Sequence, residues 1–447
     1  MVMDVRQLVI RECIMKSQMA AMRVWLMVMA AAVLVACGGG GGSSPPPVGT
    51  APVISGLTIS PSAAYVSDSP PNFSSQFDFT DPDGNLAFLT LKILDGNGVT
   101  VDLQTLPIEG VNGLTTGTIL GEVIPSAVNP DIYTAQIFVT DATGLKSNTL
   151  TGSVRIAAYP WATQLADPVP REYAASAVLD GKVYVMGGQR TDSGVIPGPA
   201  TNLVAIYDPA SNTWSAATPM PTARMGLVAA VINGRIYAIG GRTDGYSTSA
   251  VGTVEVFDPG TQLWTTGNPM PTPRYFAAAA VTGGEILVSG GNFETNVLRT
   301  LEAYNPLTNQ WRNRAAMPTA RAQLAMAEAN GRLYAVGGYA GLISQWVGSV
   351  EEYNPLADTW AVRASMPTVR AHLALAQIDG KLLAAGGENV NRSLDLLESY
   401  DPVANVWLTK TPSLTAFTRA TAGVVSGKML VFGNTLSLAY DPANEIR

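Results

Sequence analysis

The sequence predicts an all-β protein in which a six-bladed β-propeller, residues 158–447, follows a smaller β-sandwich, residues 51–157. Two observations lead to this prediction. A short apolar strand, a Gly pair and an aromatic-Asp-Pro or aromatic-Asn-Pro turn recur with a period of roughly 46 to 53 residues, a length typical of a propeller blade. Before this array, short alternating strands separated by turns are typical of a sandwich.

The repeat is marked by two elements that keep the same order in every copy. The Gly pairs are Gly187-Gly188, Gly240-Gly241, Gly290-Gly291, Gly337-Gly338 and Gly386-Gly387, with Gly433-Asn434 as a degenerate sixth. The turns are Tyr207-Asp208-Pro209, Phe257-Asp258-Pro259, Tyr304-Asn305-Pro306, Tyr353-Asn354-Pro355, Tyr400-Asp401-Pro402 and Tyr440-Asp441-Pro442.

The strands before the Gly pairs are predicted to be hairpin partners. Residues 182–186 and 235–239 are short and apolar, and the turns Asp180-Gly181 and Asn233-Gly234 precede them. Such turns favour tight β-hairpins. The preceding runs are rich in Ala and Val, whose small side chains suit an innermost strand crowded near a propeller axis.

The position of the Trp residues predicts how the ring closes. Five copies end in Trp, at Trp214, Trp264, Trp311, Trp360 and Trp407. No Trp follows the last turn, whereas Trp161 stands ahead of the first copy, and Arg171 follows it at the spacing that separates Trp214 from Arg224. We therefore predict a last blade built from residues 420–441 and an outer strand at 158–164, which removes an open edge.

Together these elements resemble the kelch repeat. The repeat has an apolar strand, Gly-Gly, a strand that ends in the aromatic turn, Trp and Met-Pro-x-x-Arg, in this order. The strand and turn are clearest in Val254-Glu255-Val256-Phe257-Asp258-Pro259, and the copies cover residues 158–447. The resemblance implies a kelch propeller but says little about the ligand.

The N-terminus resembles that of a bacterial lipoprotein. An apolar run begins after Arg23 and ends in Leu34-Val35-Ala36-Cys37, which is similar to a lipobox. The resemblance implies that residues 1–36 are a signal peptide and that Cys37 is lipidated, with translation starting at Met1, Met15 or Met22. The run suits a signal peptide and is short for a bilayer-spanning helix, although a helix that merely anchors or is buried is the alternative.

Residues 37–50 are predicted to be a tether. Five Gly residues, two Ser and three Pro follow Cys37, so a flexible segment precedes a stiff one. In lipoproteins of this class, an Asp directly after the lipidated Cys typically retains the protein at the inner membrane. This sequence has Gly38 at that position, so the resemblance implies a lipid-anchored protein of the bacterial cell envelope, at the outer membrane. Membrane attachment is thus expected through the lipid on Cys37.

The sandwich region resembles the immunoglobulin-like (Ig-like) spacers of bacterial surface proteins, but it lacks their Cys-Trp-Cys signature. One loop there offers oxygen ligands suited to calcium, from Asp78, Asp81, Asp83 and Asn85. We favour the alternative, in which the Asp-Pro-Asp-Gly turn caps its own backbone.

Composition excludes several functions. A net charge of −7, with only 14% charged residues, argues against a nucleic-acid partner, because phosphate binding needs a basic face. His372 is the only histidine, so a multi-histidine metal site is excluded. The two cysteines, Cys13 and Cys37, lie outside the propeller, so the Tyr-Cys chemistry of kelch copper oxidases is excluded. We predict no cofactor.

Arginines recur after each Met-Pro or its equivalent, and we expect them at the mouth of the central channel. Converging guanidinium groups would favour an anionic ligand, such as a carboxylate or an acidic glycan. A residue repeated in every blade is, however, better explained as a fixture between blades, the role we favour for most of them. The six are Arg171, Arg224, Arg274, Arg321, Arg370 and Arg419.

The positions that differ between blades are better candidates for ligand binding, because aromatic rings, amides and charges suit a sugar or a peptide. Two residues beyond each Arg stand Tyr173, Gly226, Phe276, Gln323, His372 and Thr421. After the Gly pairs stand Gln189, Arg190, Arg242, Asn292, Tyr339 and Glu388, and a long loop adds Trp346 as an exposed anchor. For His372, a partly buried and hydrogen-bonded side chain is the favoured alternative.

Two functions remain open. The first is a surface-tethered, non-catalytic propeller that binds a protein or glycan ligand, anionic or not, on its loop face. The second is a carbohydrate-active isomerase resembling periplasmic six-bladed kelch sialic acid mutarotases, in which Glu388 would act as an acid or base while arginines hold a carboxylate. We favour the first.

Overall fold

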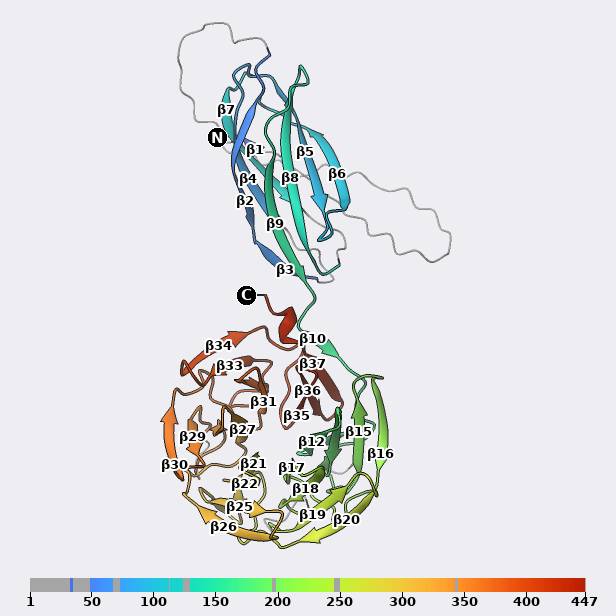
Figure 1. The fold of residues 1–447 in the computed structure, drawn as a ribbon, viewed down its shortest axis with the longest axis vertical. Helices are drawn as coiled ribbons and strands as arrows, with labels where there is room; N and C mark the ends of the chain where they lie inside the picture. The colour runs from blue at the N-terminus through green and yellow to red at the C-terminus, as the bar shows by residue number, and fades with distance from the viewer. Residues whose placement is uncertain are drawn as a thin grey trace. The chain divides into compact units, whose positions relative to one another are not determined.

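The computed structural model describes residues 33–34, 49–66, 73–111, 113–123, 129–194, 198–244, 250–341 and 345–446. The chain divides into two compact units, with the boundary between Ala158 and Tyr159 (Figure 1). The predicted signal peptide and tether, including Cys37, lie outside the described residues apart from 33–34 and 49–50. In the part of the chain that the structure describes, no helix has the length and hydropathy needed to cross a membrane.

The first unit consists of two sheets. One has the order β1 (Val33–Leu34), β7 (Thr116–Val123), β4 (Phe73–Thr80) and β2 (Val53–Ser60). The other has the order β3 (Ala63–Tyr65), β9 (Leu150–Ala157), β8 (Asp131–Asp141), β5 (Leu86–Leu94) and β6 (Thr100–Pro107). Strand β4 alternates buried and exposed residues, and Phe77 and Phe79 pack in one core with Ile137 and Val139 of the other sheet. The alternation thus builds a two-layer core, as expected for a sandwich.

Two of the four calcium candidates, Asp78 and Asp81, bond within their own sheet and turn. The buried Asp81 carboxylate accepts hydrogen bonds from the backbone N–H groups of Asp83, at 3.3 Å, and Asn85, at 2.9 Å. Asp78 accepts one from Thr118 Oγ1 at 2.6 Å. Asp141 caps a second turn in the same way. Among the described residues, no three acidic, His or Cys side chains are placed to hold a metal. These contacts support the turn interpretation over the calcium site.

The second unit contains, within its described residues, six four-stranded antiparallel sheets arranged around a ring (Figure 1). We call them blades 1 to 6 and give their strands from the axis outward. Blade 1 has β12 (Ala175–Leu179), β13 (Lys182–Met186), β15 (Val204–Asp208) and β16 (Thr213–Ala217); blade 2 has β17 (Val228–Ile232), β18 (Arg235–Ile239), β19 (Val254–Asp258) and β20 (Leu263–Gly267). Blade 3 has β21 (Ala278–Thr282), β22 (Glu285–Ser289), β25 (Leu301–Asn305) and β26 (Gln310–Arg314).

Blade 4 has β27 (Ala325–Ala329), β28 (Arg332–Val336), β29 (Val350–Asn354) and β30 (Thr359–Arg363); blade 5 has β31 (Ala374–Ile378), β32 (Lys381–Ala385), β33 (Leu397–Asp401) and β34 (Val406–Lys410). Blade 6 has β35 (Thr421–Val425), β36 (Lys428–Gly433), β37 (Leu436–Tyr440) and β10 (Trp161–Thr163). Short accessory pairs are β11 (Arg171–Glu172) with β14 (Gln189–Arg190) and β23 (Asn292–Phe293) with β24 (Asn296–Val297); η1 is Pro442–Asn444.

The core of this unit lies between neighbouring blades. Strands such as β13 and β18 are buried on both faces, which fits their near-continuous apolar sequences. Tyr184 and Met186 of blade 1 pack in one cluster with Ile236 and Phe257 of blade 2. Each blade therefore depends on the next for burial, as in other repeat arrays.

Blade 6 is completed by the strand that precedes blade 1. Trp161 lies opposite Tyr440, and Thr163 lies opposite Leu438, in the antiparallel ladder between β10 and β37. This is the pairing that the position of Trp161 predicts. The two ends of the array are thereby hydrogen-bonded to each other.

The tryptophans also connect neighbouring blades. The indole N–H of each repeat tryptophan donates to a backbone carbonyl outside its own sheet, at 2.7–3.0 Å. The six pairs are Trp161 with Thr411, Trp214 with Leu165, Trp264 with Thr218, Trp311 with Asn268, Trp360 with Ala315, and Trp407 with Ala364.

Candidate functional site

Five of the six repeated arginines are structural. They are at most 2% exposed, and each forms a salt bridge with a buried acidic side chain. Each also donates to backbone carbonyls of its own blade, as Arg224 does to Gly240 at 2.8 Å. The prediction that they reach the mouth of the channel as ligand-binding residues is wrong, because they are buried and ion-paired, whereas the favoured structural role agrees with these contacts. The five are Arg171, Arg224, Arg274, Arg321 and Arg370.

The Gly pair and the arginine form one joint between successive blades. The Gly188 N–H donates to the Arg224 carbonyl at 2.8 Å. Gly187 has φ of +63°, and a Cβ on it would lie 2.5 Å from the same carbonyl oxygen. A side chain at this position is therefore excluded by both conformation and space. The Gly pair thus holds successive blades together and does not serve to bind a ligand.

Beyond these arginines, six residues form a closed ring of backbone hydrogen bonds around the propeller axis. Each N–H donates to the carbonyl of the ring residue of the preceding blade, at 2.8–3.2 Å. The bonds run from Gly226 to Tyr173, Phe276 to Gly226, Gln323 to Phe276, His372 to Gln323, Arg419 to His372 and Tyr173 to Arg419. We call these six residues the axial ring.

Arg419 belongs to the axial ring, which corrects its assignment as the sixth repeated arginine. In blade 6 that structural position is held by Phe417, whose carbonyl accepts from Gly387 N–H at 2.8 Å. In the segment Phe417-Thr418-Arg419, the arginine therefore lies two residues after the position that the repeated arginine has in the other blades. Thr421, predicted at the variable position, instead begins β35.

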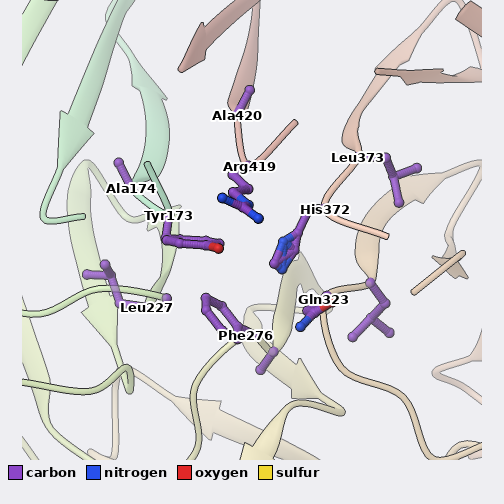
Figure 2. Close-up of a pocket in the computed structure, with 12 residues that line it drawn as sticks. Tyr173, Ala174, Leu227, Phe276, Gln323, His372, Leu373, Arg419 and Ala420 are labelled. Carbon is purple, nitrogen blue, oxygen red and sulfur yellow. The ribbon is translucent and has the colours of Figure 1, made fainter. Parts of the chain in front are cut away.

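All six axial-ring residues have left-handed backbone conformations, with φ between 52° and 63°. Only Gly226 adopts this conformation without steric cost, and bulky residues rarely do. The hydrogen-bonded ring holds the other five there, and such strain is typical of functional positions. It directs the side chains of Tyr173, Phe276, Gln323, His372 and Arg419 toward one another around a cavity (Figure 2).

The cavity has a volume of about 110 Å³, and its lining combines aromatic and aliphatic side chains with those of Gln323, His372 and Arg419. The ring centroids of Tyr173 and Phe276 are 4.9 Å apart, and each lies 5.1–5.2 Å from that of His372. Gly226 stands between the two aromatic residues, and a Cβ there would approach the Phe276 ring to 2.7 Å. Glycine at this position therefore permits the aromatic contact. The remaining wall includes Gln323, Leu324 and Leu373.

His372 is neutral at physiological pH. Its Nδ1 and Nε2 atoms are buried and have no hydrogen-bond partner among the described residues. Burial, and to a smaller extent the positive charge of Arg419, lowers the pKa of His372 to about 3. The imidazole therefore offers one donor and one acceptor to a molecule in the cavity. The favoured alternative, a hydrogen-bonded His372 side chain, is wrong, because neither ring nitrogen has a hydrogen-bond partner among the described residues.

Arg419 is the one cationic side chain among the residues that line the cavity, and it is paired. It forms ion pairs with Glu172, at 3.1 Å, and with Glu388, at 3.4 Å. Its Cζ lies 5.3 Å from the Tyr173 ring centroid. Glu172 had no signal in the repeat pattern, because it lies between the buried Arg171 and the axial-ring Tyr173. Burial raises the pKa of the Tyr173 hydroxyl to about 12, so it stays protonated.

The other predicted site residues lie outside the cavity lining. Arg190 forms a salt bridge with Asp192, and Gln189 donates to the Gly198 carbonyl. Arg242 lies over the rings of Tyr275, at 5.0 Å, and Phe276, at 5.6 Å. The ring centroids of Tyr339 and Trp346 are 5.7 Å apart, and Trp346 is partly buried rather than exposed.

Comparisons with known proteins identify the repeats. A family described as KLHDC2/KLHL20/DRC7 Kelch-repeats domain matches residues 148–291 and 219–362, and the Kelch motif matches residues 370–412. The chain thus carries kelch-repeat domains, which confirms the kelch resemblance.

The similar proteins share only part of the chain. Kelch repeat and BTB domain-containing protein 12 of Danio rerio is 33% identical over 87 residues, 18% of this chain and 14% of that protein. Kelch-like protein 25 of Homo sapiens is 36% identical over 76 residues, 17% of this chain and 12% of that protein. The chain therefore spans less than a quarter of the length of these curated relatives. A solved structure titled "Structure of YjhT" has 19% identity and a TM-score of 0.47, covering 64% of this chain and 96% of that one.

Proposed function

We propose that this protein is a non-catalytic binding protein of the bacterial cell envelope. A lipid on Cys37 anchors it to the outer membrane, an Ig-like sandwich serves as a spacer, and a six-bladed kelch propeller binds a protein or glycan ligand. The ligand docks on the loop face, with one group inserted among the side chains of the axial ring.

The observation that carries this proposal is the contrast within the axial ring. Its six backbone positions share one hydrogen-bond pattern and one left-handed conformation. Yet their side chains are all different: two kinds of aromatic ring, an amide, an imidazole, a guanidinium and none at Gly226. A structural position tends to keep the same residue, as the arginine buried in five of the six blades illustrates. A strained, repeated backbone that presents six different residues is instead suited to recognising one asymmetric ligand.

The size of the cavity indicates how a ligand docks. Sites for whole drug-sized molecules are on the order of 300–1,000 Å³, whereas this cavity has about 110 Å³. Only one group of a larger ligand therefore enters it. The rest contacts the surrounding loop residues, including Arg242, Tyr339 and Trp346.

The protonation states make His372 and Tyr173 poor general acids or bases, so the isomerase alternative would have to rely on Glu388 alone. A general acid or base works best with a pKa near the operating pH. The pKa of His372 is lowered to about 3 and that of Tyr173 is raised to about 12. Both therefore move away from neutrality, and each side chain remains a hydrogen-bonding group of fixed protonation.

A binding screen on the full-length protein tests the proposal. Glycan and peptide arrays would be probed with the wild type, with Tyr173→Ala, and with Leu356→Ala as a control. Leu356 is 95% exposed in the turn between β29 and β30, at the opposite end of its strands from the Gly337-Gly338 loop. We expect a ligand that the wild type and the control retain and Tyr173→Ala loses. A ligand held equally by all three would place the site elsewhere, and anomer exchange of a bound sugar by NMR would favour the isomerase.

The anchor is tested separately. The mass of the mature N-terminus would be compared in cells with and without globomycin, which blocks lipoprotein signal cleavage. We expect a lipid-modified Cys37 in untreated cells, and an unmodified N-terminus would contradict the proposed attachment.

A further inference from the structure

We propose that the group inserted in the axial ring is the terminal ring of a neutral sugar, recognised through its hydroxyl groups and its apolar face. This inference rests on the proposed binding function and narrows its ligand class. It also departs from the anionic ligand that six converging arginines would favour.

The charges around the cavity disfavour an anion. Arg419 already contacts two carboxylates, Glu172 at 3.1 Å and Glu388 at 3.4 Å. The side chains of Glu172 and Glu388 are only 24% and 22% exposed, so their negative charges remain close to any bound group. An incoming carboxylate would have to displace one of them or be repelled by both. A neutral group meets neither obstacle.

The same pairing suits hydroxyl groups. A hydroxyl both donates and accepts a hydrogen bond, so neighbouring hydroxyls on a sugar need donors and acceptors side by side. Arg419 supplies guanidinium donors at the lining, and its ion pairs with Glu172 and Glu388, which lie outside the lining, keep its charge compensated. Gln323 has an amide with both functions, and the neutral imidazole of His372 has two unpartnered nitrogens. These three groups occupy consecutive positions of the axial ring, as Figure 2 shows.

The opposite side of the axial ring is aromatic, and the Tyr173 hydroxyl is its polar group. Tyr173 and Phe276 lie in contact, with ring centroids 4.9 Å apart, and Gly226 between them adds no side chain. Aromatic rings with a polar edge are suited to ligands that have one apolar and one polar side. A sugar ring is such a ligand, because its C–H groups form a face and its hydroxyls project from the edge. The two halves of the axial ring match these two sides.

Matched neutral and acidic sugars distinguish the two ligand classes. The full-length protein would be titrated calorimetrically with glucose and glucuronic acid, with galactose and galacturonic acid, and with oligosaccharides that end in each. We expect a neutral member to bind at least ten times more tightly than its acidic counterpart. We also expect its affinity to change less than twofold between 50 and 500 mM salt, because a neutral ligand is not screened. Tighter, salt-sensitive binding of the acidic member would overturn the inference.

The variant Glu388→Gln gives opposite results for the two classes. Removing the negative charge weakens binding of a neutral sugar, by roughly fivefold or more, because Arg419 loses an ion pair that orients its donors toward the cavity. It would strengthen binding of an acidic sugar, because a repulsive charge is removed. Glu328→Gln is the control, since Glu328 is exposed at the β27–β28 hairpin and bonds only the Gly331 N–H. A stronger interaction in Glu388→Gln would contradict the neutral class.

The failure of this inference differs from failure of the proposed function. Peptide binding that depends on Tyr173, with no sugar bound, would overturn the sugar and leave the binding function in place. If neither array gave a ligand that depends on Tyr173, both proposals would fail.

Discussion

Trp161 and Tyr440 lie opposite each other in the β10–β37 ladder, and their ring centroids are 5.1 Å apart. Trp161 also packs against Phe417 and donates its indole N–H to the Thr411 carbonyl at 3.0 Å. A three-residue strand at one end of the array thus holds the other end in place. Because each blade buries its neighbour, opening this junction exposes the inner faces of two blades.

Replacing Trp161 with Ala should therefore destabilise the propeller strongly. Removal of a fully buried Trp typically costs about 3–5 kcal/mol, and the residue is 3% exposed. Urea denaturation monitored by circular dichroism measures the change. Leu356→Ala, at a site 95% exposed, is the control and should stay within about 0.5 kcal/mol of the wild type. A loss as small for Trp161→Ala would show that β10 does not close the ring.

The buried ion pairs predict a second effect. Arg224 Nη2 and Glu255 Oε2 are 2.7 Å apart, and both side chains are at most 3% exposed. Arg224→Met should cost about 3–5 kcal/mol, because it leaves Glu255 buried without its partner. Arg224→Met combined with Glu255→Leu should recover much of that loss. Arg235→Ala, which breaks an exposed pair with Asp258, should cost at most about 1 kcal/mol.

Blade 1 shows that the acidic partner can be supplied from another position while the arginine is kept. Ala205 occupies the position that Glu255 has in blade 2, as the pairing of each with β13 or β18 shows. Arg171 there takes Asp167 as its partner instead, at 3.0 Å. If the double variant of blade 2 were no more stable than Arg224→Met alone, the unpaired carboxylate would not be the cause of the loss.

The fold was largely predictable from the sequence because its signals are local. Gly pairs, Asp-Gly and Asn-Gly turns and five-residue apolar runs each specify a strand or a hairpin within a few residues. The pairing of the Trp161 strand with the last blade was also predictable, because the last repeat lacks a Trp and an extra Trp precedes the first repeat. The strands of the sandwich followed from simple alternation, as in β4.

The site was less predictable because it depends on contacts between blades. The repeat places Arg224 and Arg419 in equivalent positions by residue type, but backbone hydrogen bonds make Phe417 the equivalent of Arg224. Likewise, the sequence alone allows the repeated arginines to be interpreted as charges that converge on a ligand. Only the structure shows that most of them are paired with a buried glutamate. Tyr173, Phe276, Gln323 and His372 were found as the residues that vary, whereas Glu172 was missed because only its contact with Arg419 gives it a role.

His372 makes stability depend on pH with a defined sign. Its pKa is about 3 in the folded protein and ordinarily about 6.5, so below pH 6.5 the unfolded chain binds a proton that the folded one does not. This contribution to stability is fully present above pH 6.5 and is lost as the pH falls toward 3, by on the order of 3 kcal/mol at pH 4. His372→Gln should therefore lose less stability than the wild type between pH 7 and pH 4. Equal losses in thermal melts would contradict a buried, neutral imidazole.

Gly226 allows the shape of the axial ring to be tested without removing any ligand-binding group. Gly226 has φ of +63°, and a Cβ on it would lie 2.7 Å from the Phe276 ring. Gly234, in the β17–β18 hairpin, has φ of +70° and nothing within 4 Å of a Cβ. Both Gly→Ala variants should lose about 1 kcal/mol or more for the left-handed backbone.

Only Gly226→Ala should also move Phe276 away from Tyr173 and weaken ligand binding. The difference between the two variants therefore isolates the steric effect on the cavity from the backbone cost. It is measured by thermal melting and by ligand titration of the same two proteins. If Gly226→Ala and Gly234→Ala bound the ligand equally well, the contact between Tyr173 and Phe276 would not form part of the site. If only Gly226→Ala lost affinity at comparable stability, the missing side chain in the axial ring would be a determinant of recognition.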